Sequence, residues 1–265
     1  MPFPMTIPYY QVDAFTDRVF GGNPAGICLL PAWLPDTMLQ KIALENNLSE
    51  TAFLVRKGDD FELRWMTPSV EVDLCGHATL ASAFVIFSEL AHVVPAVRFH
   101  TKSGVLGARR DGTRITLDFP AMKAARSEVP AALAGGLGWI PRECWKTRDY
   151  LAVFEKEEEV LSLAPDFAQL AALDCLGVIV TAPGNDCDFV SRFFAPGAGI
   201  PEDPVTGSAH STLTPYWAAR LGKAQLHARQ LSARRGELWC EDRGERVGIG
   251  GNCVLYSRSQ IEVPE

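Results

Sequence analysis

Residues 64–78, RWMTPSVEVDLCGHA, and residues 192–209, RFFAPGAGIPEDPVTGSA, repeat one pattern in the two halves of the chain. Each stretch begins with Arg near the end of a strand-like run and reaches Pro four residues later. An acidic segment follows, and a Gly then opens a mostly apolar helical run. The two glycines, Gly76 and Gly207, are 131 positions apart, about half of the 265 residues. Two matches in the same order favour an internal duplication.

The duplication predicts two similar α/β halves, each a curved sheet around a central helix. The expected halves are residues 1–120 and 121–265, with an irregular linker at 121–130 and a cleft between the halves. The central helices are expected at 75–90 and 207–221. Further helical patterns cover 36–47 and 155–173, the second interrupted by Pro165. Strands are expected at 7–15, 25–30, 51–56, 61–67, 97–102, 105–110, 114–119, 151–154, 177–182 and 189–195, with four more between 224 and 256.

The composition is that of an ordinary globular protein, with 47% hydrophobic and 22% charged residues. A net charge of −7 argues against binding to nucleic acid or to an anionic membrane. The seven cysteines are odd in number and show no Cys-x-x-Cys spacing, which indicates a reducing compartment. The first residues lack the pattern of a signal peptide, and no apolar run approaches the ~18 residues of a membrane span. We therefore expect a cytoplasmic protein without nucleic-acid or membrane partners.

Cofactor and metal motifs are missing from the sequence. No Gly-x-Gly-x-x-Gly follows a strand pattern, and there is no Walker loop. The five histidines show no spacing typical of a metal site, and Cys75 with His77 alone is too sparse for a tight one. We expect neither a cofactor nor a metal.

Glu50 is a candidate acid/base because it immediately precedes the apolar strand pattern 51–56. A carboxylate at the mouth of a buried strand can be partly desolvated, which raises its pKa towards the range useful for proton transfer. The alternative from position alone is a solvated glutamate at a strand edge.

The two glycine-bearing helix starts are candidate anion-binding sites. Gly76 and Gly207 would let a ligand approach unpaired backbone N–H groups, although each can equally serve only close packing. His77 can donate to a substrate oxygen or be a structural histidine. Cys75, beside Gly76, can be a proton-transferring thiol or a small buried residue.

The second helix start carries further polar groups. Asp203 can bind substrate or act as an N-terminal helix charge, and Ser208 can bind substrate or cap the helix. Both alternatives stay open on the residues alone.

Six short motifs occur in a set order along the chain: VDAF (12–15), GNP (22–24), NLSETAF (47–53), DLCGHAT (73–79), LDFP (117–120) and EDPVTGSAH (202–210). In this order the sequence closely resembles the PhzF-like, or phenazine biosynthesis-like, isomerase family. The resemblance implies the diaminopimelate epimerase fold, an α+β fold with two similar halves, each a mixed, curved sheet wrapped around a central helix. It also implies a cofactor-independent and commonly homodimeric enzyme that acts on a small carboxylate-bearing substrate.

The resemblance assigns roles to individual positions. It makes Glu50 the acid/base that moves a proton between substrate carbons. It places His77, Asp203 and Ser208 among the catalytic residues. The positions it assigns to substrate binding are Cys75, Gly76, Thr206 and Gly207.

Cys75 departs from the phenazine enzyme, which has a small apolar residue at this point. It is reminiscent of two-thiol epimerases of the same fold, but their second thiol would fall near Thr206, where this chain has no Cys. Two alternatives to the Glu50 isomerase therefore remain. One is an epimerase or racemase that uses Cys75, and the other is a non-catalytic small-molecule-binding protein.

Overall fold

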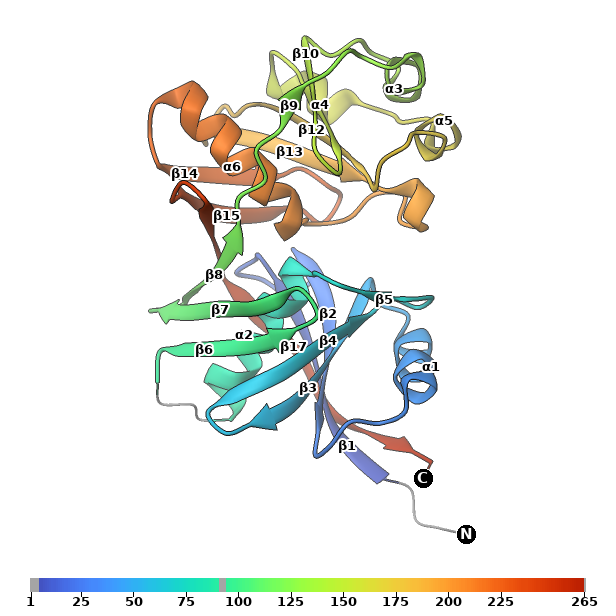
Figure 1. The fold of residues 1–265 in the computed structure, drawn as a ribbon, viewed down its shortest axis with the longest axis vertical. Coiled ribbons are helices and arrows are strands. Elements are labelled where there is room, and N and C mark those ends of the chain that lie inside the picture. Colours follow the sequence, from blue (N-terminus) through green and yellow to red (C-terminus); the bar gives the residue numbers. More distant parts are fainter. Residues whose placement is uncertain (1–4, 91–93, 265) are drawn as a thin grey trace. The chain divides into compact units, whose positions relative to one another are not determined.

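The computed structural model describes residues 5–90 and 94–264 and divides into two compact units (Figure 1). The first unit contains Met1–Asp118 and Gly250–Glu265, and the second contains Phe119–Ile249. The expected second half, 121–265, differs from the second unit at its C-terminal end. There the last strand, β17 (Cys253–Val263), pairs antiparallel with the first strand, β1 (Met5–Ala14), so it belongs to the first unit.

The sheet of the first unit is mixed. Its strands pair in the order β8-β7-β6-β4-β3-β2-β1-β17. The short strand β5 pairs with the last residues of β4. The pairs β2–β3 and β4–β6 are parallel and the others are antiparallel. The remaining bounds are β2 Asn23–Leu30, β3 Glu50–Lys57, β4 Asp60–Met66, β5 Glu71–Val72, β6 Ala96–Thr101, β7 Gly104–Asp111 and β8 Arg114–Pro120.

Two helices pack on the sheet of the first unit. Helix α2 (Gly76–Glu89) is the central one, with eleven of its 14 residues buried, and it contacts β1, β2, β3, β7 and β17. Helix α1 (Asp36–Asn46) contacts β3 and β4 and buries Leu39 and Ile42 in a cluster with Phe53. Figure 1 shows α1 and α2 on different sides of these strands.

The second unit also holds a mixed sheet around one long helix. Its strands are β9 Ala125–Arg126, β10 Glu143–Lys146, β11 Tyr150–Val153, β12 Val178–Pro183, β13 Phe189–Phe194, β14 Gln225–Gln230, β15 Gly236–Asp242 and β16 Arg246–Gly251. Its helices are α3 Ala131–Leu137, α4 Glu157–Ser162, α5 Phe167–Ala171, the 3-10 turn η1 Pro196–Ala198 and α6 Gly207–Leu221. Helix α6 contacts β14 and β15, while α4 covers β12 and β13.

Helix α6 contains Pro215, which has no N–H to bond the carbonyl of Ser211 one turn earlier. The backbone N–H of Met122 donates to that carbonyl instead, at 2.9 Å. The segment expected to be the linker is therefore docked on the central helix of the second unit.

The two units repeat one order of pairing. In the first, β2 is parallel to β3, β3 antiparallel to β4, β4 parallel to β6, and β6 antiparallel to β7. In the second, β11, β12, β13, β14 and β15 pair in the same sequence of directions. The central helix follows the second hairpin strand in both units. The predicted α+β fold of two similar halves is confirmed.

The expected elements are all present, although β17 extends to Val263, beyond the predicted limit of 256. Five short elements were not predicted, namely β5, β9, β10, α3 and η1. Within the part of the chain that the structure describes, no helix is long and apolar enough to cross a membrane.

The strand that begins at Glu50 depends on a buried aromatic ring for its packing. Phe53 is 0% exposed in the cluster beneath α1. We expect Phe53→Ala to lower the free energy of unfolding by about 3–5 kcal/mol, because it leaves a cavity in a packed core. Phe20→Ala is the matched control, since Phe20 is 68% exposed, and it should change the free energy by no more than about 0.5 kcal/mol. Urea unfolding followed by circular dichroism measures both, and equal effects would contradict the described core.

Candidate active site

Glu50 is placed by the turn that follows α1. Helix α1 ends at Asn46, and its C-cap residue Asn47 has a left-handed φ of 49°, a conformation that asparagine tolerates better than most residues. The chain then enters β3 at Glu50, which pairs in parallel register with Ala25 of β2. Glu50 is only 9% exposed. The alternative of a solvated strand-edge glutamate is therefore wrong.

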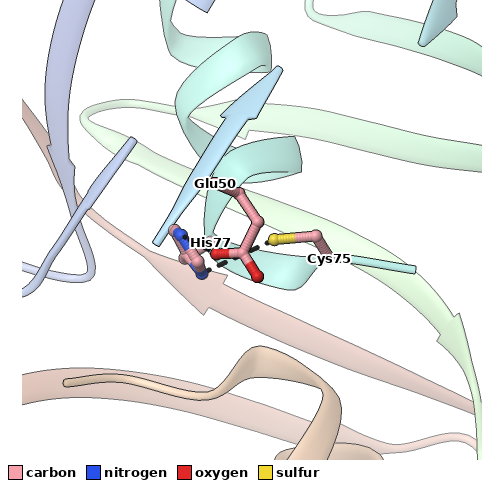
Figure 2. A group of neighbouring side chains, drawn as sticks. All are labelled: Glu50, Cys75 and His77. Carbon is pink, nitrogen blue, oxygen red and sulfur yellow. Dashed lines mark hydrogen bonds and ion pairs between the residues drawn. The ribbon is translucent and has the colours of Figure 1, made fainter. Parts of the chain in front are cut away.

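Glu50, Cys75 and His77 form one buried cluster in the first unit (Figure 2). The Nε2 atom of His77 lies 3.1 Å from Oε2 of Glu50, within an ion-pair distance. The Nδ1 atom of His77 lies 3.6 Å from the sulfur of Cys75. Cys75 is the N-cap residue of α2 and His77 is the second residue of that helix. The start of β3 and the start of α2 thus bring three predicted site residues together.

Asn23 is a site residue that the sequence analysis did not select. It is 0% exposed, and its amide nitrogen lies 3.1 Å from Nδ1 of His77. The preceding residue must be glycine, because Gly22 has a φ of 59° and a Cβ there would lie 2.0 Å from the carbonyl oxygen of Ala14. The GNP motif at 22–24 was the available signal, since it combines a turn glycine with an amide at the start of a strand.

The cluster favours a charged imidazole and a neutral thiol. Burial and the nearby Glu50 carboxyl raise the pKa of Cys75 to about 11, so its sulfur is a protonated thiol at neutral pH. A helix start favours thiolate character, but burial outweighs that effect here. Burial also lowers the pKa of His77, but Cys75 and Glu50 outweigh it and raise that pKa well above 6.5. Because Cys75 is neutral, we attribute the proton on His77 to the charge of Glu50.

The donor atoms of Glu50, Cys75 and His77 lie within 4.8 Å of one another, which is a spacing that a metal ion can bridge. His77, however, directs Nδ1 towards Cys75 and Nε2 towards Glu50. Neither imidazole nitrogen faces both Cys75 and Glu50, so the ring would have to turn before all three residues could bind one metal ion. In the observed arrangement Nε2 of His77 is in ion-pair contact with Glu50, and Nδ1 lies at hydrogen-bonding distance from the Cys75 sulfur.

Asp203 and Thr206 form a second polar group, in the second unit. The hydroxyl of Thr206 donates to Oδ2 of Asp203 at 2.6 Å, and both residues are buried. The side-chain amide of Gln230 donates to the carbonyl of Asp203 at 2.8 Å and accepts from the N–H of Thr206 at 2.8 Å. This network gives the loop before α6 a defined shape.

The N-cap residue of α6 is Thr206, so Ser208 does not cap the helix. Gly207 and Ser208 are the first two residues of α6, and Ser208 is half-buried. No N-cap side chain of α2 or α6 accepts a hydrogen bond from the first turn of its helix. The amide groups at both helix starts thus retain the partial positive charge that attracts anions.

Comparison with known proteins gives the family. The model of the phenazine biosynthesis-like protein family (PhzC-PhzF) matches residues 12–259. The chain belongs to the phenazine biosynthesis-like family. It is 54% identical to an uncharacterized isomerase of Pseudomonas aeruginosa, over 98% of this chain and all of that protein. It is also similar to the crystal structure of a PhzF-family protein from Enterococcus faecalis, with 46% identity, a TM-score of 0.94, and coverage of 97% and 99% of the two chains.

The phenazine biosynthesis-like fold extends to more distant structures. A hydroxyproline epimerase from Agrobacterium vitis shares the fold with a TM-score of 0.64 at 12% identity, covering 98% of this chain and 93% of that one. The predicted family and the diaminopimelate epimerase-like fold are thereby confirmed. The predicted enzyme class, isomerase, is confirmed by the isomerase relatives.

His210 gives this family member a pH-dependent stability. The ring is 0% exposed, and burial lowers its pKa to about 4, although Nδ1 donates to the carbonyl of Thr206 at 2.9 Å. Between pH 6.5 and pH 4 the unfolded chain binds a proton at this position that the folded chain does not. The free energy of unfolding therefore falls as the pH falls through this range, by up to about 3 kcal/mol.

We expect His210→Asn to flatten this dependence, because an asparagine amide can donate to Thr206 but does not titrate. Urea unfolding at half-unit steps from pH 4 to pH 7 measures it. Parallel curves for the two proteins would show that His210 is not the group responsible.

Proposed function

We propose that Glu50 is the general acid/base of a cofactor-independent isomerase that moves a proton on a small carboxylate-bearing substrate. The observation that carries the proposal is the buried pair of Glu50 and His77, 3.1 Å apart at the uncapped start of α2. A buried histidine whose pKa is raised by a neighbouring carboxyl is typical of catalytic sites.

The proposed reaction uses the carboxylate twice. Glu50 removes a proton from a carbon that an adjacent carbonyl or diene makes acidic, and it then returns the proton to another carbon. One carboxylate serves both steps because it remains over one face of the substrate. Charge that develops on the substrate carboxylate is stabilised by the amide groups at the start of α2.

His77 has two supporting roles in this proposal. Its positive charge, held 3.1 Å from the Glu50 carboxyl, can offset negative charge in the buried site. It is also in place to donate a proton to a substrate oxygen. Asp203 and Ser208 remain predicted as groups that handle heteroatom protons and bind substrate, together with Gly76, Thr206 and Gly207.

An epimerase that uses Cys75 is the rival function. The contact between the Cys75 sulfur and Nδ1 of His77 at 3.6 Å is the observation in its favour. The raised pKa of this thiol argues against it, because the nucleophilic or basic form of Cys is the thiolate.

Glu50→Gln tests the proposal directly. The amide keeps the size of the side chain but cannot accept a proton, so we expect hydrogen exchange from the substrate to fall by about a thousandfold. The measurement is deuterium wash-in from D₂O, followed by mass spectrometry, on a panel of unsaturated, cyclic-diene and α-amino carboxylic acids. Glu45→Gln is the control, because Glu45 lies exposed on α1, and it should leave exchange unchanged.

Cys75→Ala separates the two functions. If Glu50 is the acid/base, this variant retains exchange within about tenfold of the wild type, because only a neighbour of His77 is lost. Full exchange in Glu50→Gln together with its loss in Cys75→Ala would replace the proposal with the epimerase.

A further inference from the structure

The two units share an ion pair of the same geometry at the same position of the repeat. In the first unit, Arg64 of β4 makes two bonds to Glu71, from Nε to Oε1 at 2.8 Å and from Nη2 to Oε2 at 2.8 Å. In the second, Arg192 of β13 binds Glu202 through the same atoms at 2.7 and 3.0 Å. Such two-pronged pairs fix orientation as well as distance, which lysine cannot do.

Both pairs are sheltered from solvent. The side chains of Arg64 and Glu71 are 19% and 17% exposed, and those of Arg192 and Glu202 are 12% and 23% exposed. Each guanidinium also lies near an aromatic ring, Trp33 for Arg64 and Phe194 for Arg192. These pairs therefore differ from exposed ion pairs, which contribute little to stability.

The first pair anchors the loop that leads into α2. Glu71 lies four residues before Cys75 and also accepts a bond from Lys102 at 2.6 Å. The hydroxyl of Ser103 donates to the carbonyl of Asp73, again at 2.6 Å. Residues 67–75 are thus tied to the neighbouring strands just before the chain reaches His77.

The second pair anchors the loop that leads into α6. Glu202 immediately precedes Asp203, whose N–H donates to the carbonyl of Phe193 at 3.0 Å. The remaining guanidinium nitrogen of Arg192 donates to the carbonyls of Val160 and Leu163, at 3.1 and 2.9 Å. Arg192 thereby connects the end of α4 to the loop that carries Asp203.

We propose that Arg64–Glu71 and Arg192–Glu202 are positioning pairs that hold the two helix-start loops, residues 67–75 and 195–206, in the geometry required for catalysis. The catalytic part of this inference rests on the proposed function. A misplacement of about 1 Å at a catalytic group can reduce a rate about a hundredfold. A rigid two-pronged anchor directly before each helix start limits such displacement.

The effect of each ion pair on the rigidity of its loop can be tested without any substrate. The variants are Arg64→Lys, Glu71→Gln, Arg192→Lys and Glu202→Gln, all of which keep the side chains close in size. Hydrogen–deuterium exchange with mass spectrometry reports on peptides covering 67–75 and 195–206. We expect exchange at least about tenfold faster in the loop whose pair is altered and no change in the other loop. Glu245→Gln is the control, because its partner Lys123 and Glu245 itself are 62% and 88% exposed.

Labelling of Cys75 by iodoacetamide gives a second readout for the first pair. Cys75 is 5% exposed, and loosening of residues 67–75 should increase its labelling about tenfold. Cys28, which is 0% exposed within β2, reports global unfolding and should stay equally slow in all variants. Equal acceleration at both cysteines, or unchanged exchange and labelling in all four variants, would overturn the proposal.

The catalytic consequence is measured on the acid that exchanges fastest in the D₂O panel. We expect kcat to fall about 10- to 100-fold with KM within about threefold, because the pairs place groups and do not touch substrate. The double variant Arg192→Lys with Glu202→Gln should be no slower than the slower single variant, as for residues that act as one unit. Loosened loops with unchanged kcat would overturn the positioning role. If the altered pairs loosen the loops but the Glu50→Gln variant remains active, the ion pairs do anchor the loops and the proposed function of Glu50 is wrong.

Discussion

The cost of burying a charged carboxyl beside an imidazole governs the candidate site. Glu50 and His77 are 9% and 3% exposed, and removing either charge from water is expensive unless the partner remains in place. The two side chains come from different elements, the start of β3 and the start of α2. The parallel pairing of β2 with β3 and the left-handed turn at Asn47 therefore matter because they keep those two starts together.

The two units use one topology for two different chemistries. The helix start of α2 combines Cys75 and His77 with the acid Glu50, and its imidazole is charged. The helix start of α6 combines Thr206 with Asp203 and Gln230, and the nearby His210 is buried with a lowered pKa. The difference follows from the neighbours, because His77 has a carboxyl at ion-pair distance, whereas burial is the largest influence on the pKa of His210. The repeated topology thus provides two uncapped helix starts, and the surrounding side chains make them chemically different.

Local patterns in the sequence were sufficient for the central helices, for most strands and for Glu50, Cys75 and His77 as candidates. They did not reveal that β17 pairs with β1, because alternation of apolar residues identifies a strand but not its partner. Helix α3 was missed since Ala131–Leu137 is short and contains two glycines, which are poor helix formers. Asn23 was missed as a site residue because its role exists only where β2, β3 and α2 meet.

The neighbours of Glu50 also decide which base the cluster can use. A carboxylate and a thiolate in one buried space would need two compensating positive charges, and among the residues of the described cluster only His77 supplies one. The charge balance therefore disfavours a thiolate at Cys75. Nε2 of His77 faces the Glu50 carboxyl, whereas the neutral Cys75 thiol and the Asn23 amide lie beside Nδ1. The Cys75 sulfur can accept from Nδ1–H and so orient the imidazole, and the imidazole in turn contacts the carboxyl group that we propose as the base.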